Sequence, residues 1–315
     1  MNFQEGPFAG GLETVFLTPT ISLRSGVPDT LPALQYWRER VKLQARALMH
    51  RRVTDQWLRV LNAHPVFCDL VRDSPKLLYK IYRPYMSNVL CAEARLRVLA
   101  THYGFVFSRG MGPLIVAAAR AGVALGSVEG KTGSIYELQL RAVSTMEREG
   151  ELVLQLCDGG TPVFSLAFTF AEDEGQQIVC IGCIQGPKGS DGLEAIRTAT
   201  RELHGARPKH LLVTLVRQLG HAVGCSRVRL VGNANRVVHG AIRRGKVMAD
   251  YDQMWNELGA ERRADGDYTI ACEPVPEPDM EQIQSKKRSE ARKRHAVVLE
   301  LADALVASLA KPLNP

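Results

Sequence analysis

The chain has 315 residues, 45% of them hydrophobic, so it can bury a substantial core as one large domain or two small ones. Its formal net charge of +7 favours anionic partners such as nucleotide cofactors, acidic lipids or nucleic acid, without choosing among them. No apolar stretch reaches the ~18 residues that a membrane span needs, and Met1–Gly11 lacks the basic region and apolar run of a secretory signal. We therefore expect a cytoplasmic protein without a transmembrane segment.

The first part of the chain is predicted to be irregular and then mainly helical. Residues 1–33 are rich in Gly, Pro and Thr, and the helical region is expected over residues 34–130. Leu34–Leu61 carries apolar residues at helical spacing with basic residues between them, which predicts one or two helices with an apolar face. The apolar positions in its first half are Leu34, Trp37, Val41, Ala45 and Leu48. Shorter helical segments are expected at Val66–Leu70, Pro75–Tyr82, Asn88–Gly104 and Leu114–Ala124.

Residues 131–275 are predicted to form a mixed central sheet flanked by helices. Strands are expected at Tyr136–Ser144, Glu151–Cys157, Val163–Phe170, Gln176–Gln185, Val228–Val231 and Tyr268–Cys272. The sequence Asp158-Gly159-Gly160-Thr161 is a hairpin turn signal. The interior of Gln176–Gln185 is apolar throughout, so we expect this strand to be buried on both faces.

Helices are predicted between the later strands of this sheet. They are expected at Leu193–His204, Pro208–Gly224, Ala234–Arg243 and Tyr251–Leu258. Pro208–Gly224 has its proline at the start and its glycine at the end, which is the usual asymmetry of a helix. The predicted fold class is therefore α/β (α+β), with a helical N-terminal region followed by the mixed sheet.

Residues 276–315 are predicted to contain one long amphipathic helix, Met280–Leu309, after a Pro-rich exit from the sheet. Its first half is basic, and its second half carries an apolar stripe. The stripe consists of Val297, Leu301, Leu305 and Leu309. The basic run around Lys286, Lys287 and Arg288 is either a solvated helix face or a contact for nucleic acid or anionic lipid. It lacks the interleaved aromatic residues that stack on bases, which argues against sequence-specific nucleic-acid binding.

Seven cysteines are scattered along the chain, and their odd number is typical of free thiols in a reducing compartment. Cys180 and Cys183 form a C-x-x-C pair, but no second pair follows at zinc-binding spacing. Both lie in a predicted strand, so we expect them to belong to the core.

The turn Gly205-Ala206-Arg207-Pro208-Lys209 opens a predicted helix and is a candidate anion site. Free backbone N–H groups at a helix start attract anions, and Arg can hold a phosphate through two hydrogen bonds. Pro208 removes one of these donors. An ordinary capped helix with surface charges is the alternative interpretation.

Two other positions lie at predicted strand ends, where open α/β sheets bind ligands. Gln185 and Gly186 follow the buried strand, and the glycine permits close approach of a ligand to the backbone. Asn233 follows the next strand and is a candidate ligand contact, whereas Asn235 is expected to cap a helix.

His204 and His239 flank this region and are candidate general bases, because the ordinary pKa of an imidazole lies near the working pH. Most single histidines are structural, so that interpretation stays open. A metal cluster of Glu202, His204, His210 and His239 is a further alternative, although no recognised ligand spacing is present.

Several stretches resemble the VirK/YbjX family of bacterial proteins, which is known as a domain of unknown function. They are Leu96–Tyr103, Ile181–Pro187, Thr200–Lys209, Tyr251–Gly259 and Lys286–Arg288. Together they span roughly residues 66–309. The resemblance implies a link with virulence, envelope stress and surface-protein expression, and no settled reaction.

The order of parts in Glu151–Ala271 also resembles the core of GNAT-type N-acyltransferases. In that core a hairpin is followed by a splayed strand, a pyrophosphate-binding helix start, a second strand, an Asn and a helix. Gly205–Lys209 stands in place of the family's usual glycine-rich loop, and Leu193–His204 is an additional helix before it. The resemblance implies coenzyme A or another acyl donor as the bound molecule, and an amine of a peptide or small molecule as the acceptor.

The leading hypothesis is acyl or aminoacyl transfer from such a phosphate-bearing donor to an amine. Arg207 and Lys209 would hold the donor's phosphates, and backbone N–H groups at Ile184–Gln185 would orient the acyl carbonyl. His204 or His239 would accept the proton of the amine.

In the same hypothesis, Tyr251 would donate a proton to the leaving group. Two other functions stay open. The first is a metal-dependent oxygenase, with iron or copper, that modifies a peptide. The second is a non-catalytic virulence or envelope-stress factor that acts through an anionic surface contact at Lys286, Lys287 and Arg288.

Overall fold

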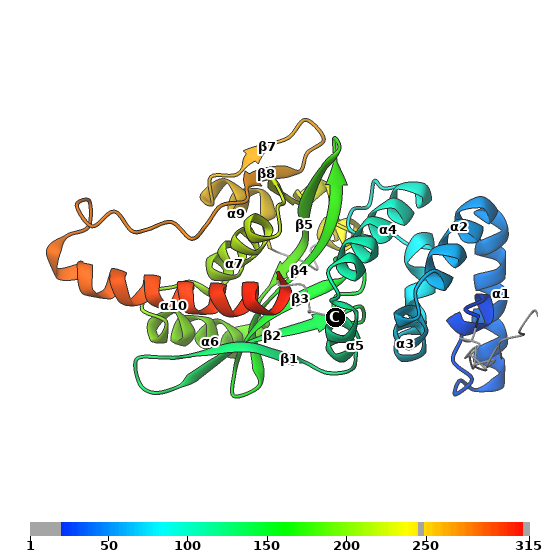
Figure 1. The fold of residues 1–315 in the computed structure, drawn as a ribbon, viewed down its shortest axis with the longest axis horizontal. Coiled ribbons are helices and arrows are strands. Elements are labelled where there is room, and N and C mark those ends of the chain that lie inside the picture. The colour runs from blue at the N-terminus through cyan, green and yellow to red at the C-terminus, as the bar shows by residue number, and fades with distance from the viewer. Residues whose placement is uncertain (1–19, 245–248, 311–315) are drawn as a thin grey trace, which may run out of the picture.

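The computed structural model describes residues 20–244 and 249–310, and in this part of the chain eight strands form one mixed sheet. The order across the sheet is β1-β2-β3-β4-β5-β6-β8-β7. The strands are β1 (Val123–Glu129), β2 (Ile135–Ala142), β3 (Leu152–Asp158), β4 (Thr161–Asp173), β5 (Gln176–Gln185), β6 (Arg227–Leu230), β7 (Glu261–Arg262) and β8 (Tyr268–Ala271). The expected combination of a helical N-terminal region, a mixed sheet and a long C-terminal helix is confirmed (Figure 1).

The N-terminal helices lie at one end of the molecule, with α4 and α5 against the sheet (Figure 1). They are η1 (Leu23–Gly26), α1 (Ala33–Met49), α2 (Arg51–Asn62), α3 (Val66–Asp73), η2 (Pro75–Tyr82), α4 (Ala92–Ser108) and α5 (Gly112–Arg120). The expected helix over Leu114–Ala124 ends earlier, and β1 begins at Val123. The apolar run from 114 to 124 fits either element, and the extended backbone of Ala121 together with pairing to β2 decides for a strand.

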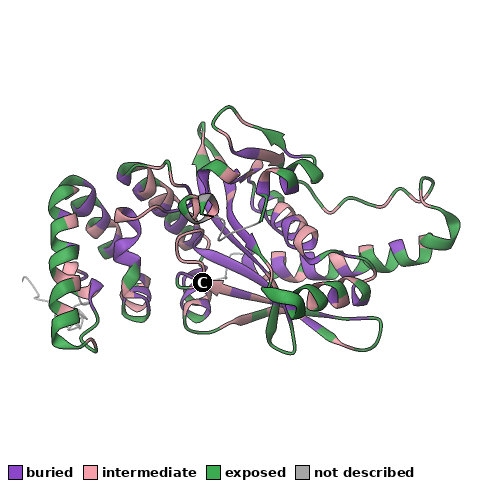
Figure 2. Ribbon diagram, turned by 180° about the vertical axis from the view of Figure 1, so that it is seen from behind, coloured by how far each residue is buried: buried purple, intermediate pink, exposed green. Residues whose placement is uncertain are grey.

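The apolar face predicted for the first helix points away from the core. Leu34 and Leu48 are 84% and 76% exposed, whereas Leu43 and Ala47, on the opposite side of α1, are buried. Figure 2 shows the outer side of α1 exposed along its length. Helical spacing was therefore correct, but it could not tell which side of the helix meets the rest of the protein.

Strands β1 to β5 form an antiparallel meander that supplies much of the core (Figure 2). The turn between β3 and β4 places Gly159 and Gly160 at φ values of 53° and 80°, which is why glycines occupy both positions of the tight turn. The interior of β5 is largely buried, as its apolar composition predicts.

Strands β5 and β6 are parallel, and they pair only over a short length before they separate. The paired residues run from Val179–Val228 to Ile181–Leu230, and the Val231 amide then donates to the Ile181 carbonyl. Two helices connect these strands, α6 (Gly189–Glu202) and α7 (Pro208–Ala222). We call the opening beyond Ile181 and Val231 the fork.

After β6 the chain adds the last strands, β7 and β8, to the sheet, and then continues into a long helix. After β6 come η3 (Asn233–Asn235), α8 (His239–Arg243) and α9 (Tyr251–Glu257), and α10 (Ser285–Leu309) is the last helix in the described part of the chain. Helix α10 packs on α7 and β1. Its predicted apolar stripe is buried at all four positions. No helix in residues 20–244 and 249–310 combines the length and the apolar character that crossing a membrane requires.

A buried polar network joins the N-terminal helices to the sheet. Lys80 Nζ of η2 lies 2.5 Å from Glu151 Oε1, beside the start of β3, and the Tyr103 hydroxyl donates to Glu151 Oε2 at 2.6 Å. Both charged side chains are almost fully buried, at 2% and 1% exposure. Burial is tolerated because each charge has close hydrogen-bonding partners.

Candidate functional site

The turn between α6 and α7 is an abrupt chain reversal with an exposed arginine at its end. His204 and Gly205 have φ values of 54° and 84°, and the Gly205 amide donates to the Thr200 carbonyl, which closes α6. Arg207 is the N-cap residue of α7 and is exposed. Within the described ranges its guanidinium has no hydrogen bond or ion pair, so it is available to a ligand.

Lys209, unlike Arg207, has an ion-pair partner. Its ammonium lies 3.1 Å from a carboxylate oxygen of Glu257 in an exposed ion pair. Such a pair contributes only about 0–1 kcal/mol, so a phosphate could replace Glu257 at small cost.

An apolar hollow of about 600 Å³ lies on one side of Arg207. Its floor includes Phe164 and Ile196, and basic side chains of α6 and α7 surround it. Gly186 lies against the same two residues, because a Cβ there would come within 2.8 Å of each. The structure thus brings the predicted residues Gly186, Arg207 and Lys209 to one place.

A second hollow, of about 380 Å³, lies on the other side of Arg207, between α7 and α10. We call it the basic hollow. It is lined by Gly205, Arg207, His210, Arg294 and His295, among others, and by no carboxylate of a described residue. The Nε2 atoms of both histidines are buried and have no hydrogen-bond partner in the described part of the chain. Buried polar atoms normally have partners, so this hollow suits a ligand that carries hydrogen-bonding oxygens.

The pKa values of His210 and His204 are both lowered, which favours the neutral form of these two side chains. Burial lowers the pKa of His210, and the neighbouring Lys209 and Arg207 lower it further. Burial also lowers the pKa of His204, with smaller contributions from Lys131 and Lys293. Neutral imidazoles at pH 7 can donate or accept a hydrogen bond without adding charge. His204 itself is half-buried beside the basic hollow.

The fork is closed by Tyr251, which sequence reasoning had placed in proton transfer. Its hydroxyl accepts from the Ile184 amide at 2.8 Å and donates to the Ile184 carbonyl at 2.7 Å. The side chain is buried, burial raises its pKa well above the usual value, and the Arg236 guanidinium lies 3.6 Å from its ring centroid. The expectation that the Ile184 amide is free to orient an acyl carbonyl is therefore wrong for this conformation. The exposed residue Gln185 follows directly.

Neither Asn233 nor His239 lines the two hollows beside Arg207. The Asn233 side chain bonds to Asp250 and to the Tyr251 amide, so it fixes the start of α9. His239 begins α8, and the residues just before α8 contact Asn88 and Arg148. Sequence reasoning grouped these residues with the turn only because they follow the same strand.

The four-residue metal cluster considered from sequence does not form. The Glu202 carboxylate accepts hydrogen bonds from the amide and hydroxyl of Thr132. Among residues 20–244 and 249–310, no three His, Cys, Asp or Glu side chains gather in an arrangement that could hold a metal ion.

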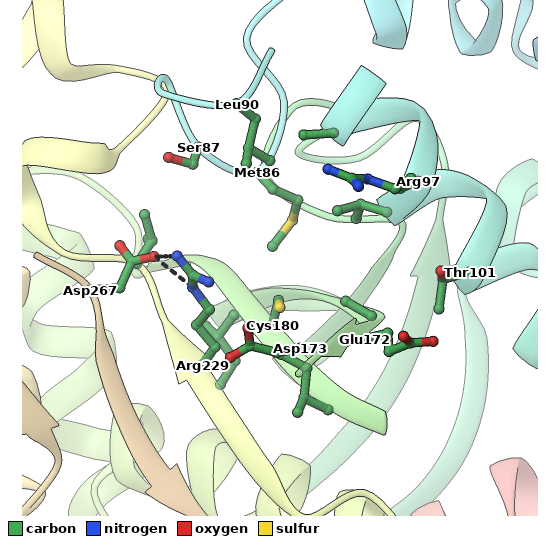
Figure 3. Close-up of a pocket in the computed structure, with 16 residues that line it drawn as sticks. Met86, Ser87, Leu90, Arg97, Thr101, Glu172, Asp173, Cys180, Arg229 and Asp267 are labelled. Atoms are coloured by element: carbon green, nitrogen blue, oxygen red, sulfur yellow. Dashed lines mark hydrogen bonds and ion pairs between the residues drawn. The ribbon is translucent and has the colours of Figure 1, made fainter. Parts of the chain in front are cut away.

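Sequence reasoning missed a cavity of about 380 Å³ between α4 and the strands β4, β5 and β6 (Figure 3). Arg229 pairs there with Asp267 at 2.7 Å, whereas Arg97 extends over the cavity without an ion-pair partner in the described part of the chain. Burial raises the pKa of the Cys180 thiol to about 12, so this thiol is not a nucleophile at neutral pH. The lining comes from distant segments, so no local motif could have revealed it. Cys180 of β5 lines this cavity, whereas its neighbour Val179 lies against Gly220 of α7, so the cavity and α7 are on opposite faces of the sheet.

Comparison with known proteins places the chain among bacterial proteins without an assigned reaction. The uncharacterized protein YbjX of Escherichia coli strain K12 is 26% identical over 284 residues, which cover 88% of this chain and 84% of that protein. An uncharacterized protein of Haemophilus influenzae is 32% identical over 143 residues, covering 44% of this chain and 46% of that protein. A cAMP-binding acyltransferase from Mycobacterium smegmatis matches with a TM-score of 0.28 and 13% identity, over 64% of each chain, and a match this distant carries no argument.

A family model described as "Protein of unknown function (DUF535)" matches residues 32–307, which is most of the chain. The match includes the stretches on which the VirK/YbjX resemblance rests. The chain therefore belongs to this family of proteins of unknown function.

Proposed function

We propose that this protein transfers an acyl or aminoacyl group from a phosphate-bearing donor, such as an acyl-coenzyme A, to an amine. The donor's phosphates would bind around Arg207. One observation carries the proposal: an exposed, unpaired arginine stands at a helix start beside the basic hollow, where the buried Nε2 atoms of His210 and His295 have no partner in the described part of the chain. Helix N–H groups, guanidinium and imidazole N–H groups are the donors that phosphate oxygens use.

The surroundings of Arg207 suit the two ends of such a donor. The basic hollow would hold the phosphates, with Arg294 as a second guanidinium. The apolar hollow over Phe164 and Ile196 would hold the uncharged part of the donor, close to Gly186 at the end of β5.

Within this proposal, His204 is the general base that the position favours. It lies next to the turn, and its lowered pKa keeps it able to accept a proton at neutral pH. We give Tyr251 a structural role in holding the fork together and no proton-transfer role, because its hydroxyl hydrogen is donated to the Ile184 carbonyl and its oxygen accepts from the Ile184 amide.

Isothermal titration calorimetry with coenzyme A and acetyl-coenzyme A tests the donor site. The double variant Arg207→Ala with Lys209→Ala should weaken binding by roughly 100-fold or more, since it removes two cationic donors and each charged hydrogen bond to phosphate is worth about 1.5–3 kcal/mol. A matched control removes one arginine and one lysine elsewhere, Arg59→Ala with Lys76→Ala, and should bind as the wild type does. Equal binding by both double variants would exclude the Arg207 turn as the phosphate site.

Transfer is tested separately from binding. Protein, acetyl-coenzyme A and lysine-containing peptides are incubated, and mass spectrometry follows acetylation of the peptide amines. His204→Gln should leave coenzyme A binding intact and slow transfer by 100-fold or more, in the range that a general base contributes. Tight binding without transfer to any amine would reject acyl transfer while leaving the anion site in place.

A further inference from the structure

Helix α1 presents an apolar stripe to solvent. Nine large hydrophobic residues are exposed in the described part of the chain, and five of them lie on this helix. They are Leu34 (84% exposed), Trp37 (59%), Val41 (59%), Leu48 (76%) and Met49 (72%). Single exposed apolar residues are ordinary, but five on one helix form a patch of the kind that marks an interaction surface.

The stripe faces directly away from the protein. Leu43 and Ala47 hold α1 to its neighbours from the opposite side of the helix. Figure 2 shows the outer side of α1 exposed over its whole length, at the end of the molecule. A helix whose apolar side is open along its length can lie on a flat partner such as a bilayer surface.

The charges beside the stripe are almost all positive. Helix α1 contains four basic residues and one acidic residue, Glu39. Lys42 and Arg38 neutralise that carboxylate at 3.0 and 3.4 Å, and their side chains remain 48% and 62% exposed. Arg40 lies on the other flank, with its guanidinium 5.3 Å from the Trp37 ring centroid.

We propose that α1 lies on the surface of a bilayer that contains anionic lipids. Its apolar stripe would enter the boundary between headgroups and acyl chains, and the flanking basic side chains would reach the headgroup phosphates. An apolar stripe, basic flanks and a tryptophan are the combination that interfacial helices use. This surface is independent of the Arg207 turn and does not rest on acyl transfer.

The protein carries its own reporter for this contact. Trp37 is exposed, whereas Trp57 and Trp255 are 1% and 0% exposed. Vesicles of phosphatidylcholine and phosphatidylglycerol should shift the tryptophan emission to the blue, and brominated acyl chains should quench it. Vesicles of phosphatidylcholine alone should do neither to a comparable extent.

Vesicle co-sedimentation with variants locates the contact. Leu34→Gln with Trp37→Gln and Leu48→Gln should weaken binding to anionic vesicles by roughly tenfold or more, because three apolar side chains lose their burial. A matched control changes exposed apolar residues elsewhere: Val89→Gln, Ile135→Gln and Leu193→Gln, at positions 66%, 53% and 56% exposed, should bind within about twofold of the wild type. Circular dichroism checks that both triple variants are folded.

A second variant separates the charges from the stripe. Arg38→Gln with Lys42→Gln should weaken binding to anionic vesicles and leave the weak binding to neutral vesicles unchanged.

Three results would overturn the proposal. One is equal vesicle binding by the two triple variants. Another is a blue shift that grows with protein concentration in the absence of vesicles, which would assign the stripe to a second copy of the chain. The third is failure of acrylamide to quench Trp37 in the free protein, which would mean that the stripe is already covered.

Discussion

Replacing Lys80 with methionine removes one partner of a buried ion pair and should destabilise the whole protein. The wild-type ammonium lies 2.5 Å from a Glu151 oxygen and 3.1 Å from the Val143 carbonyl oxygen. Methionine has a similar length and no charge, so the Glu151 carboxylate would stay in the core with one fewer donor. The Tyr103 hydroxyl would still donate to the carboxylate.

The burial of the pair sets the expected magnitude. With exposures of 2% and 1%, water cannot replace the lost ammonium without opening the structure. Breaking a buried pair from one side costs about 3–5 kcal/mol. The double variant Lys80→Met with Glu151→Met removes both charges and should recover at least about 2 kcal/mol of that loss. It should not recover everything, because Tyr103 then lacks its acceptor, at a cost of about 1–3 kcal/mol.

Urea unfolding followed by circular dichroism measures these free energies. Lys76→Met is the matched control, because its side chain is 72% exposed and its ion-pair partner is 4.0 Å away, so it should cost less than about 1 kcal/mol. Two results would refute the reasoning. One is a Lys80→Met variant that is no less stable than Lys76→Met. The other is a double variant that is as unstable as Lys80→Met alone. Either would mean that Glu151 is hydrated or paired by another group in solution.

Three further predictions concern stability and reactivity. Burial lowers the pKa of His102 to about 3, so as pH falls the unfolded chain takes up this proton before the folded protein does. The wild type should therefore lose stability as pH falls from about 6.5 towards about 3. Urea titrations should show a smaller loss for His102→Gln over that range. Cys91 is the one exposed cysteine, so a thiol reagent should label a single fast-reacting group in the native protein, and Cys91→Ser should abolish that phase. A Cβ on Gly182 would lie 2.0 Å from the Glu149 carbonyl oxygen, so Gly182→Ala should destabilise the protein by roughly 2–3 kcal/mol. A Cβ on Gly104 would have no atom within 4 Å, so Gly104→Ala should stabilise α4 by about 0.5–1 kcal/mol. Calorimetric melting compares the two variants.

Local patterns were sufficient for most of the secondary structure. The apolar interior of Gln176–Gln185 predicted a buried central strand, and the glycine pair at Gly159 predicted the hairpin, because both signals depend on a few neighbouring residues. The apolar stripe that ends at Leu309 predicted the side on which α10 packs, because the second half of this helix has one apolar side. The basic residues lie in its first half.

The candidate site was predictable only in part. Arg207, Lys209 and Gly186 were expected near one another; Arg207 and Lys209 line the same hollow, and Gly186 lies against two other residues of its lining. The contribution of His295 could not be foreseen, because it comes from α10 and reaches α7 only through tertiary packing. The role of Tyr251 was also hidden, since its hydroxyl bonds to a strand far away in the sequence.

The sequence by itself determined most of the helices and strands, the family to which the chain belongs, and the presence of a basic helix start. Periodicity and turn residues act over a few positions, so they are readable without a structure. Only the tertiary structure decided that the apolar side of α1 faces solvent, that Tyr251 closes the fork, and that His210 and His295 line the hollow beside Arg207. These outcomes depend on which distant surfaces pack together, and the free energy of that packing is shared among residues that no local pattern connects.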